Sequence, residues 1–149
     1  MAVLVRPATK EDLPGLMRIE RECFGRERFS RRYLVSLLED QEVDSIIGMV
    51  EGEVVASAMV LHCPSTLRSR ILSLAIIPEQ QGHGCSKPLL THVEDLAKNR
   101  GSSVIFLEVR VENQAAINLY LGRGYRIGDR IPDFFGRGED AWYMERALL

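Results

Sequence analysis

The chain has 149 residues, 46% of them hydrophobic and 27% charged, with a formal net charge of -2 at pH 7. This composition is typical of a soluble globular domain, and the small net charge disfavours a polyanion-binding surface, so no nucleic-acid partner is expected. No window approaches the roughly 18 consecutive apolar residues that a membrane span needs, and no signal pattern opens the chain. We therefore expect no membrane partner and a cytoplasmic protein.

The first part of the chain carries one strand signal and two helix signals. Residues 3–6 form a short apolar run of β type. Thr9 followed three positions later by Asp12 is typical of a helix N-terminus, so a helix should begin near Lys10. Ser30 can cap a second, shorter helix, whose buried stripe consists of leucines.

The middle of the chain predicts three antiparallel strands. Residues 45–50 and 54–63 are β-rich runs on either side of a tight turn, which predicts a hairpin. A third apolar run, residues 70–77, ends at Pro78. An antiparallel meander therefore leads directly into the glycine-containing stretch that follows.

The second half predicts a helix, a strand, a helix and a last hairpin. The first helix should be about 14 residues long, with Gly101 just beyond its end. Residues 104–111 are nearly continuously apolar, as expected for a central strand covered on both faces. Residues 113–121 indicate a short helix, and residues 125–131 and 141–148 indicate a long hairpin.

The order of these elements is strand, two helices, three strands, helix, strand, helix and two strands. Such an order predicts an α/β or α+β fold with a mixed sheet and helices on its faces. No internal repeat, low-complexity tract or linker interrupts the chain. Residues 1–149 are therefore expected to form a single domain.

A glycine-containing turn lies between the meander and the next helix. Gly82, Gly84 and the small Ser86 let the backbone bend and expose the N–H groups of the first helical turn, which can hold an anion. A glycine pair before a helix is also common as a plain tight connection, so both interpretations stay open. Cys85 is interpreted as a small packing residue, because no histidine and acid accompany it as a nucleophile requires.

Glu108 is the best candidate for a catalytic residue. It lies in the apolar run 104–111, and burial disfavours a charged carboxylate unless a cation pairs with it, which is one way to make a general base. The alternative is a structural glutamate that faces water or pairs with an arginine such as Arg110 on the same strand face. Tyr120, in the following helix, is either a core residue or an acid.

The histidines and cysteines do not indicate a metal site. They lie at His62, His83, His92, Cys23, Cys63 and Cys85, without metal-ligand spacing or C-x-x-C pairing. We interpret the three histidines as surface or turn residues and predict no metal. Neither the phosphate-binding motif G-x-x-x-x-G-K-[ST] nor the hydrolase motif G-x-S-x-G occurs.

Several of these segments together resemble the GCN5-related N-acetyltransferases, the GNAT family. The matching segments are Gln81-Gly-His-Gly-Cys-Ser86, Leu107-Glu-Val-Arg110, Asn113, Ala116-Ile-Asn-Leu-Tyr120 with Gly124-Tyr125, and Gly138-Glu-Asp-Ala141. Within the family the chain is most similar to the RimI-like N-terminal protein acetyltransferases. The resemblance implies the GNAT fold, a mixed, mostly antiparallel sheet of about seven strands flanked by about four helices.

The resemblance also implies acetyl-CoA as the cofactor. The glycine turn and helix N-terminus would hold its pyrophosphate, and the preceding strand would bind the pantetheine arm and polarise the thioester carbonyl. The implied contacts are Leu74, Ala75, Ile76, Gln81, Gly82, His83, Gly84, Cys85, Ser86, Lys87 and Asn113. Gln81 stands where arginine is common in the family, and Ser86 where glycine or alanine is usual.

The resemblance assigns roles to the two ambiguous residues. Glu108 would be the general base, directly or through water, and Tyr120 the acid that reprotonates the CoA thiolate. The implied reaction is acetyl transfer to a protein or peptide N-terminal α-amine by direct attack in a ternary complex. Alternatives are a small-molecule amine or a lysine side chain as acceptor, or a non-catalytic acyl-CoA-binding module.

The residues implied on the acceptor side are aromatic. Phe134 and Phe135 stand where RimI-like members often carry tyrosines, so fewer hydroxyls are left to orient a peptide N-terminus. Phe24 and Tyr33, together with Phe29, correspond to the variable substrate-side wall of the family. These three side chains could equally be ordinary core aromatics.

Overall fold

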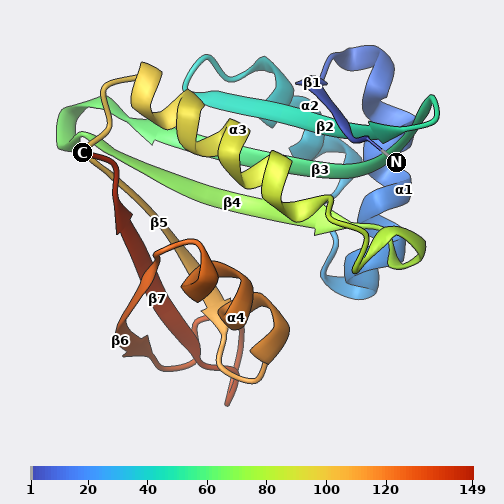
Figure 1. The fold of residues 1–149 in the computed structure, drawn as a ribbon. Helices are drawn as coiled ribbons and strands as arrows, with labels where there is room; N and C mark the ends of the chain where they lie inside the picture. The colour runs from blue at the N-terminus through green and yellow to red at the C-terminus, as the bar shows by residue number, and fades with distance from the viewer. Residues whose placement is uncertain (1) are drawn as a thin grey trace.

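One sheet of seven strands runs through the molecule, and helices cover both of its faces (Figure 1). The computed structural model describes residues 2–149. The strands are β1 (Leu4–Pro7), β2 (Val43–Val50), β3 (Glu53–Cys63), β4 (Arg68–Ile76), β5 (Val104–Arg110), β6 (Arg126–Ile131) and β7 (Ala141–Ala147). The α-helices are α1 (Leu13–Phe24), α2 (Arg31–Glu39), α3 (Ser86–Asn99) and α4 (Gln114–Gly122).

The strand order in the sheet is β1-β2-β3-β4-β5-β7-β6. β1 to β4 pair antiparallel, and so do β5 with β7 and β7 with β6, whereas β4 and β5 are parallel. The meander and the last hairpin therefore form as predicted. A mixed, mostly antiparallel sheet of seven strands with four flanking helices confirms the predicted fold class.

The helices bury two hydrophobic clusters against the first four strands. α1 and α2 lie behind the sheet in Figure 1, and a cluster that includes Leu16, Leu34 and Met59 fills the space beneath them. α3 crosses the opposite face and buries Leu89 and Leu90 completely. Removing one such side chain from water stabilises the fold by about 1.5–3 kcal/mol.

Hydrogen-bonding side chains cap the helices where the sequence predicts. A capping box joins Thr9 and Asp12 just before α1, and the Oγ of Ser30 accepts the backbone N–H of Tyr33 at 3.1 Å at the start of α2. Each such cap satisfies N–H groups that have no acceptor inside the helix. No helix among residues 2–149 is long and apolar enough to cross a membrane.

The burial of β5 differs from the prediction. Its residues alternate between partly buried and buried along the whole strand, so only the face with Ile105, Leu107 and Val109 belongs to the core. The prediction that both faces are covered is therefore wrong. The apolar run is misleading because Phe106, on the other face, is covered by the guanidinium of Arg68, 4.5 Å from its ring centroid, and not by a helix.

His62 is buried, and its prediction as a surface or turn residue is wrong. Its Nε2–H donates to Asp44 at 2.8 Å, while its Nδ1 accepts from Ser69 at 2.7 Å. Ser69 in turn lies 2.6 Å from the hydroxyl of Ser102. Burial lowers the pKa of His62, so the neutral ring that this chain of hydrogen bonds requires is favoured.

Candidate active site

β4 and β5 leave an opening in the middle of the sheet. They pair over only three residues each, Arg68 to Arg70 with Val104 to Phe106. Beyond these residues the two strands continue without pairing to each other and diverge toward their C-terminal ends (Figure 1). Because ligands of open α/β sheets bind outside the carboxyl ends of the strands, this opening is the candidate site.

The edge of β4 that faces the opening has no partner strand beyond Arg70 among residues 2–149. On the other side Leu74, Ala75 and Ile76 pair with β3, but no strand among residues 2–149 pairs with them on the β5 side. An unpaired strand edge can bind an extended ligand through its N–H and C=O groups. The three residues predicted to contact pantetheine therefore lie where such a ligand fits.

The glycine turn follows at the same end of β4. Gly82 and Gly84 have φ angles of 80° and 84°, a left-handed conformation that costs other residues strain, and nothing lies within 4 Å of where a Cβ would be. The N–H groups of Ser86 and Lys87, at the start of α3, have no acceptor inside the helix. The turn is an open, exposed cradle for an anion, which fits the pyrophosphate of CoA.

Gln81 fastens this turn to the end of β4. Its Nε2 donates to the carbonyl of Ile76 at 3.0 Å, and the Sγ of Cys23 donates to the same oxygen at 3.3 Å. Burial raises the pKa of the Cys23 thiol to about 11, so the thiol is protonated at neutral pH and available as a donor. The side chain of Gln81 is thus engaged by the protein, and its predicted contact with the cofactor stays a prediction.

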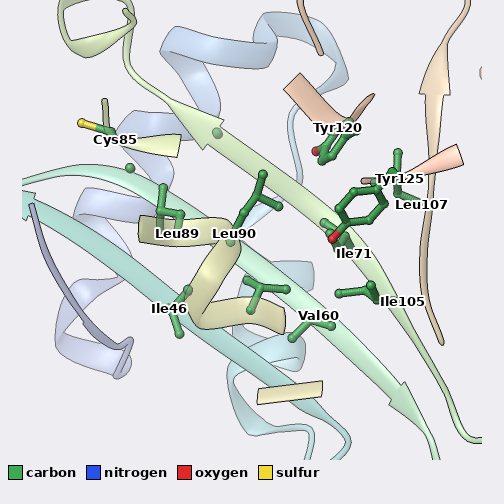
Figure 2. Close-up of a cluster of buried hydrophobic side chains, with 14 of the residues drawn as sticks. Ile46, Val60, Ile71, Cys85, Leu89, Leu90, Ile105, Leu107, Tyr120 and Tyr125 are labelled. Atoms are coloured by element: carbon green, nitrogen blue, oxygen red, sulfur yellow. The ribbon is translucent and has the colours of Figure 1, made fainter. Parts of the chain in front are cut away.

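Cys85 is buried in the main hydrophobic cluster next to Leu89 (Figure 2). Burial raises the pKa of its thiol, the opposite of what an activated nucleophile needs. Its interpretation as a packing residue therefore agrees with the structure, and its place among the cofactor contacts can concern only its backbone.

Glu108 lies on the side of β5 that faces away from the main core, with its side chain 11% exposed. Its Oε1 accepts from the Nε of Arg70 at 2.9 Å. The expected cationic partner is present, but it comes from β4 and not from Arg110, which pairs with Glu27 and Glu139 instead. The parallel register of β4 and β5 explains this choice, since it sets Arg70 beside Phe106, two residues before Glu108.

Tyr120 lies on the opposite face of the sheet from Glu108, in the core with Leu107 (Figure 2). Its ring packs edge-on against Tyr125 with centroids 5.4 Å apart. Among residues 2–149 its hydroxyl has no hydrogen-bond partner, and burial raises its pKa above the ordinary range of tyrosine. The phenol is therefore protonated at neutral pH, as a proton donor must be.

Asn113 caps α4, the helix that carries Tyr120. Its Oδ1 accepts from the N–H of Ala116 at 3.2 Å, which leaves its side-chain NH₂ for another partner. The cap satisfies one N–H at the helix start and so fixes where α4 begins. The predicted cofactor contact of Asn113 stays a prediction.

Arg110 joins the two loops on the acceptor side of Glu108. Its guanidinium donates to Glu139, in the β6–β7 loop, at 2.5 Å and to Glu27, in the α1–α2 connection, at 2.6 Å. It also lies 4.5 Å from the ring centroid of Phe135. These contacts bring the two predicted acceptor walls together at the carboxyl end of β5.

The remaining aromatic residues of these walls are partly exposed. Phe24 and Tyr33 are 38% and 41% exposed, and Phe134 is 39% exposed. Such values do not fit core residues, so the alternative that Phe24 and Tyr33 are ordinary core aromatics is not supported. Phe29 does pack partly into the cluster beneath α1 and α2. Binding of an acceptor by these side chains stays a prediction.

Two residues of β4 escaped the sequence analysis, Arg70 and Ser73. Arg70 was not singled out because its partner depends on the β4–β5 register. Ser73, further along β4, has a buried hydroxyl with no hydrogen-bond partner among residues 2–149. Side chains alternate between the two faces along a strand, but this alternation places Arg70 and Glu108 on the same face only once the parallel pairing of β4 with β5 is known.

No group of three or more His, Cys, Asp or Glu side chains in residues 2–149 could hold a metal ion.

Known proteins resemble this chain in sequence. Residues 13–125 match the model of the Acetyltransferase (GNAT) family. The N-alpha-acetyltransferase of Sulfolobus acidocaldarius is 28% identical over 155 aligned positions, which cover 97% of this chain and 92% of that protein. N-alpha-acetyltransferase 30 of Schizosaccharomyces pombe is 37% identical over 82 residues, which are 55% of each chain, so only about half of that relative is spanned.

A solved structure shares the fold along the whole chain. The crystal structure of the ribosomal-protein-S18-alanine N-acetyltransferase from Escherichia coli superposes with a TM-score of 0.87 at 24% identity, over 99% of this chain and 94% of that chain. The resemblance to the GNAT family seen in the sequence motifs is confirmed. The chain belongs to the GNAT family, and it is an acetyltransferase whose donor is acetyl-CoA.

Proposed function

We propose that this acetyltransferase transfers the acetyl group to the N-terminal α-amine of a protein or peptide, by direct attack in a ternary complex. The observation that carries the proposal is that Glu108 lies on one face of β5, beyond the last residue of β5 that pairs with β4, while Tyr120 of α4 packs in the core against the other face. One face then serves the incoming amine and the other the departing thiol. The relatives named N-alpha-acetyltransferase support the choice of an α-amine.

Glu108 is the proposed general base. Arg70 holds Oε1 of the carboxylate, so the other oxygen is free to take a proton from the ammonium of the acceptor, directly or through a water molecule. An amine attacks a thioester only when it is unprotonated, and proton transfer by a positioned group contributes typically 10² to 10⁴-fold to the rate. The loops that Arg110 joins leave the amine an approach on this face.

Tyr120 is the proposed acid. Its hydroxyl is protonated at neutral pH and free of hydrogen bonds to residues 2–149, so its O–H is available to the departing thiolate. The edge-on contact with Tyr125 fixes the ring in place. The reaction needs a base and an acid in separate surroundings, because the carboxylate of Glu108 loses its charge when it takes a proton and the phenol of Tyr120 becomes charged when it gives one up.

The same residues that the sequence indicates are proposed to hold acetyl-CoA. The free edge of Leu74 to Ile76 would align the pantetheine arm, and the turn from Gln81 to Lys87 would bind the pyrophosphate. Bound there, acetyl-CoA supplies an acyl carbon activated by its thioester. Backbone N–H groups of β4 can polarise the thioester carbonyl, as in an oxyanion hole.

The proposed function is tested with a panel of acceptors analysed by mass spectrometry. The panel holds a lysine-free peptide with a free N-terminus, the same peptide with a blocked N-terminus and one lysine, and a set of polyamines and amino sugars. We expect acetylation of the first peptide and none of the second at equal enzyme and time. Acetylation of only the lysine or only the small amines would contradict the proposal, and acetyl-CoA binding without any acetylated product would indicate a non-catalytic module.

The cofactor cradle is tested by replacing Gly84 with Ala. Because φ is 84° at this position, an alanine strains the turn by about 1 kcal/mol and shifts the N–H groups that face the ligand. We expect the affinity for CoA, measured by calorimetry, to fall about tenfold. Gly52→Ala is the matched control, since Gly52 has a φ of 82° and equally open space but lies in the β2–β3 turn. Equal CoA affinities of the two variants would contradict the assignment.

A further inference from the structure

A basic groove runs along the outer side of α1 and α2, apart from the β4–β5 opening. It consists of two cavities of about 590 and 540 Å³ that share Met17, Arg21 and Arg31 in their walls. Five cations line the two cavities, and we call them together the arginine groove: Lys10, Arg21, Arg26, Arg28 and Arg31. Glu11 is the one acidic residue among the lining side chains.

The arginines of this groove are largely without partners. Arg21, Arg26 and Arg31 have no ion pair to any of residues 2–149, and Arg28 donates only to the backbone carbonyl of Gly25 at 2.9 Å. Glu11, the nearby acid, already accepts the hydroxyl of Thr9 at 2.7 Å. Lys10, the fifth cation, pairs with Glu39 at 3.2 Å. The four arginines without a carboxylate partner among residues 2–149 form a local positive field on a chain of net charge -2, and this field favours an anionic ligand.

The N-terminus of α2 adds to this field. Ser30 and Arg31 line the larger cavity and form the cap and first residue of the helix. Ser30 satisfies the N–H of Tyr33, but the first two N–H groups of α2 have no acceptor inside the helix and carry the positive end of its dipole. The dipole of α2 and the arginine side chains therefore both favour a negatively charged ligand.

The floor of the groove is apolar and favours a peptide over a nucleic acid. Leu13, Pro14, Met17 and Phe29 lie among the cations. Phe29 is the one aromatic side chain among the lining residues, whereas proteins that bind single-stranded nucleic acid stack successive bases on several aromatic rings. A short segment with both carboxylates and aliphatic side chains matches this lining better than a phosphate backbone does.

The groove begins close to the proposed acceptor side. Arg26 and Arg28 flank Glu27, which is held by Arg110, and Arg110 lies two residues after Glu108 on the same face of β5. A rise of two strand residues separates Glu108 from Arg110, and the Arg110–Glu27 pair then spans the gap to the groove. Together these lengths put the groove roughly 20 Å from Glu108, which is about six residues of extended chain. A peptide whose α-amine lies at Glu108 can thus reach the arginines with residues further along its chain.

We propose that the arginine groove binds an acidic segment of the acceptor, roughly five to nine residues after its α-amine. This proposal rests on the proposed acetylation of protein N-termini and adds a substrate class to it. The groove selects acceptors by charge complementarity at a distance from the reacting atoms, while Glu108 and Tyr120 act on any α-amine that reaches them.

The test compares two lysine-free peptides that share their first four residues. Residues five to nine are Asp and Glu in one peptide and Asn and Gln in the other. We expect kcat/KM to be about tenfold higher for the acidic peptide at low salt, because a few exposed charge pairs supply binding energy of that order. This preference should shrink at high salt, which screens the charges. The double variant Arg21→Glu with Arg31→Glu should abolish the preference and leave kcat/KM for the amide peptide within about twofold.

The matched control is Lys98→Glu with Arg126→Glu, which changes the net charge equally at two exposed positions outside the groove. It should keep the preference for the acidic peptide. Equal kcat/KM for the two peptides in the unaltered protein, or a preference that survives reversal of the groove, overturns the proposal. So does a labelled RNA oligonucleotide that binds the groove in place of the acidic peptide. If neither peptide is acetylated, the proposed function itself fails, which is a separate result.

Discussion

Glu108→Gln is expected to slow the acetyl-transfer step about 100-fold or more. The amide has nearly the same shape and can still accept the hydrogen bond from Arg70, but it cannot take a proton from the acceptor ammonium. The rate is measured in single-turnover experiments with saturating acetyl-CoA and peptide, between pH 6 and 9. Because β4 and the glycine turn stay intact, the affinity for CoA should change by less than about threefold.

The control for this substitution is Glu112→Gln. Glu112 is an exposed acid just after β5, and it forms no ion pair with residues 2–149. It undergoes the same chemical change and should keep the rate of the unaltered protein. A Glu108→Gln variant as fast as Glu112→Gln across the pH range would remove Glu108 from the mechanism. The acid would then be a structural partner of Arg70, as a paired glutamate in a strand often is.

Glu94→Gln is expected to cost about 3–5 kcal/mol of the free energy of unfolding. Glu94, on α3, is 3% exposed and accepts from Arg123, from Arg146 at 2.8 Å and from the hydroxyl of Tyr125 at 2.9 Å. A glutamine leaves Arg123 and Arg146, whose side chains are 21% and 33% exposed, without a counter-charge at the buried position of residue 94. Urea denaturation followed by circular dichroism measures the loss.

Asp95→Asn is the control for this prediction. It removes a negative charge from the neighbouring residue of α3, which is exposed and has no ion pair among residues 2–149. We expect it to change the free energy of unfolding by less than about 0.5 kcal/mol. A loss below 1 kcal/mol for Glu94→Gln would show that water reaches the two arginines and that the network contributes little to stability.

Local signals in the sequence predict most of the elements because their causes are local. The caps at Ser30 and Asn113 act on N–H groups three residues away, and the turn at Gly84 needs only its own left-handed backbone. Alternation and breakers mark the strands. These causes operate within a few residues, so the order and the approximate bounds of helices and strands follow from the chain itself.

The errors concern contacts between distant segments. The surroundings of His62 depend on Asp44 and on two serines from other elements, and nothing near His62 in the chain indicates them. The partner of Glu108 depends on how β4 and β5 are aligned, which hydrophobic patterns do not specify between parallel strands. Glu108 stands out as a carboxylate in an apolar run, and the family resemblance assigns the roles of Glu108 and Tyr120, whereas Arg70 has no motif of its own.

The short pairing of β4 with β5 also has a thermodynamic consequence. With three residue pairs in common, the two parts of the sheet are held together mainly by side chains, and among these the network of Glu94 links α3 to the segment after α4 and to β7. A ligand lying along the free edge of β4 supplies the contacts that a neighbouring strand would have supplied. The proposed donor site therefore couples acetyl-CoA binding to the integrity of the sheet, and the resistance of the enzyme to unfolding is expected to rise with the logarithm of donor concentration.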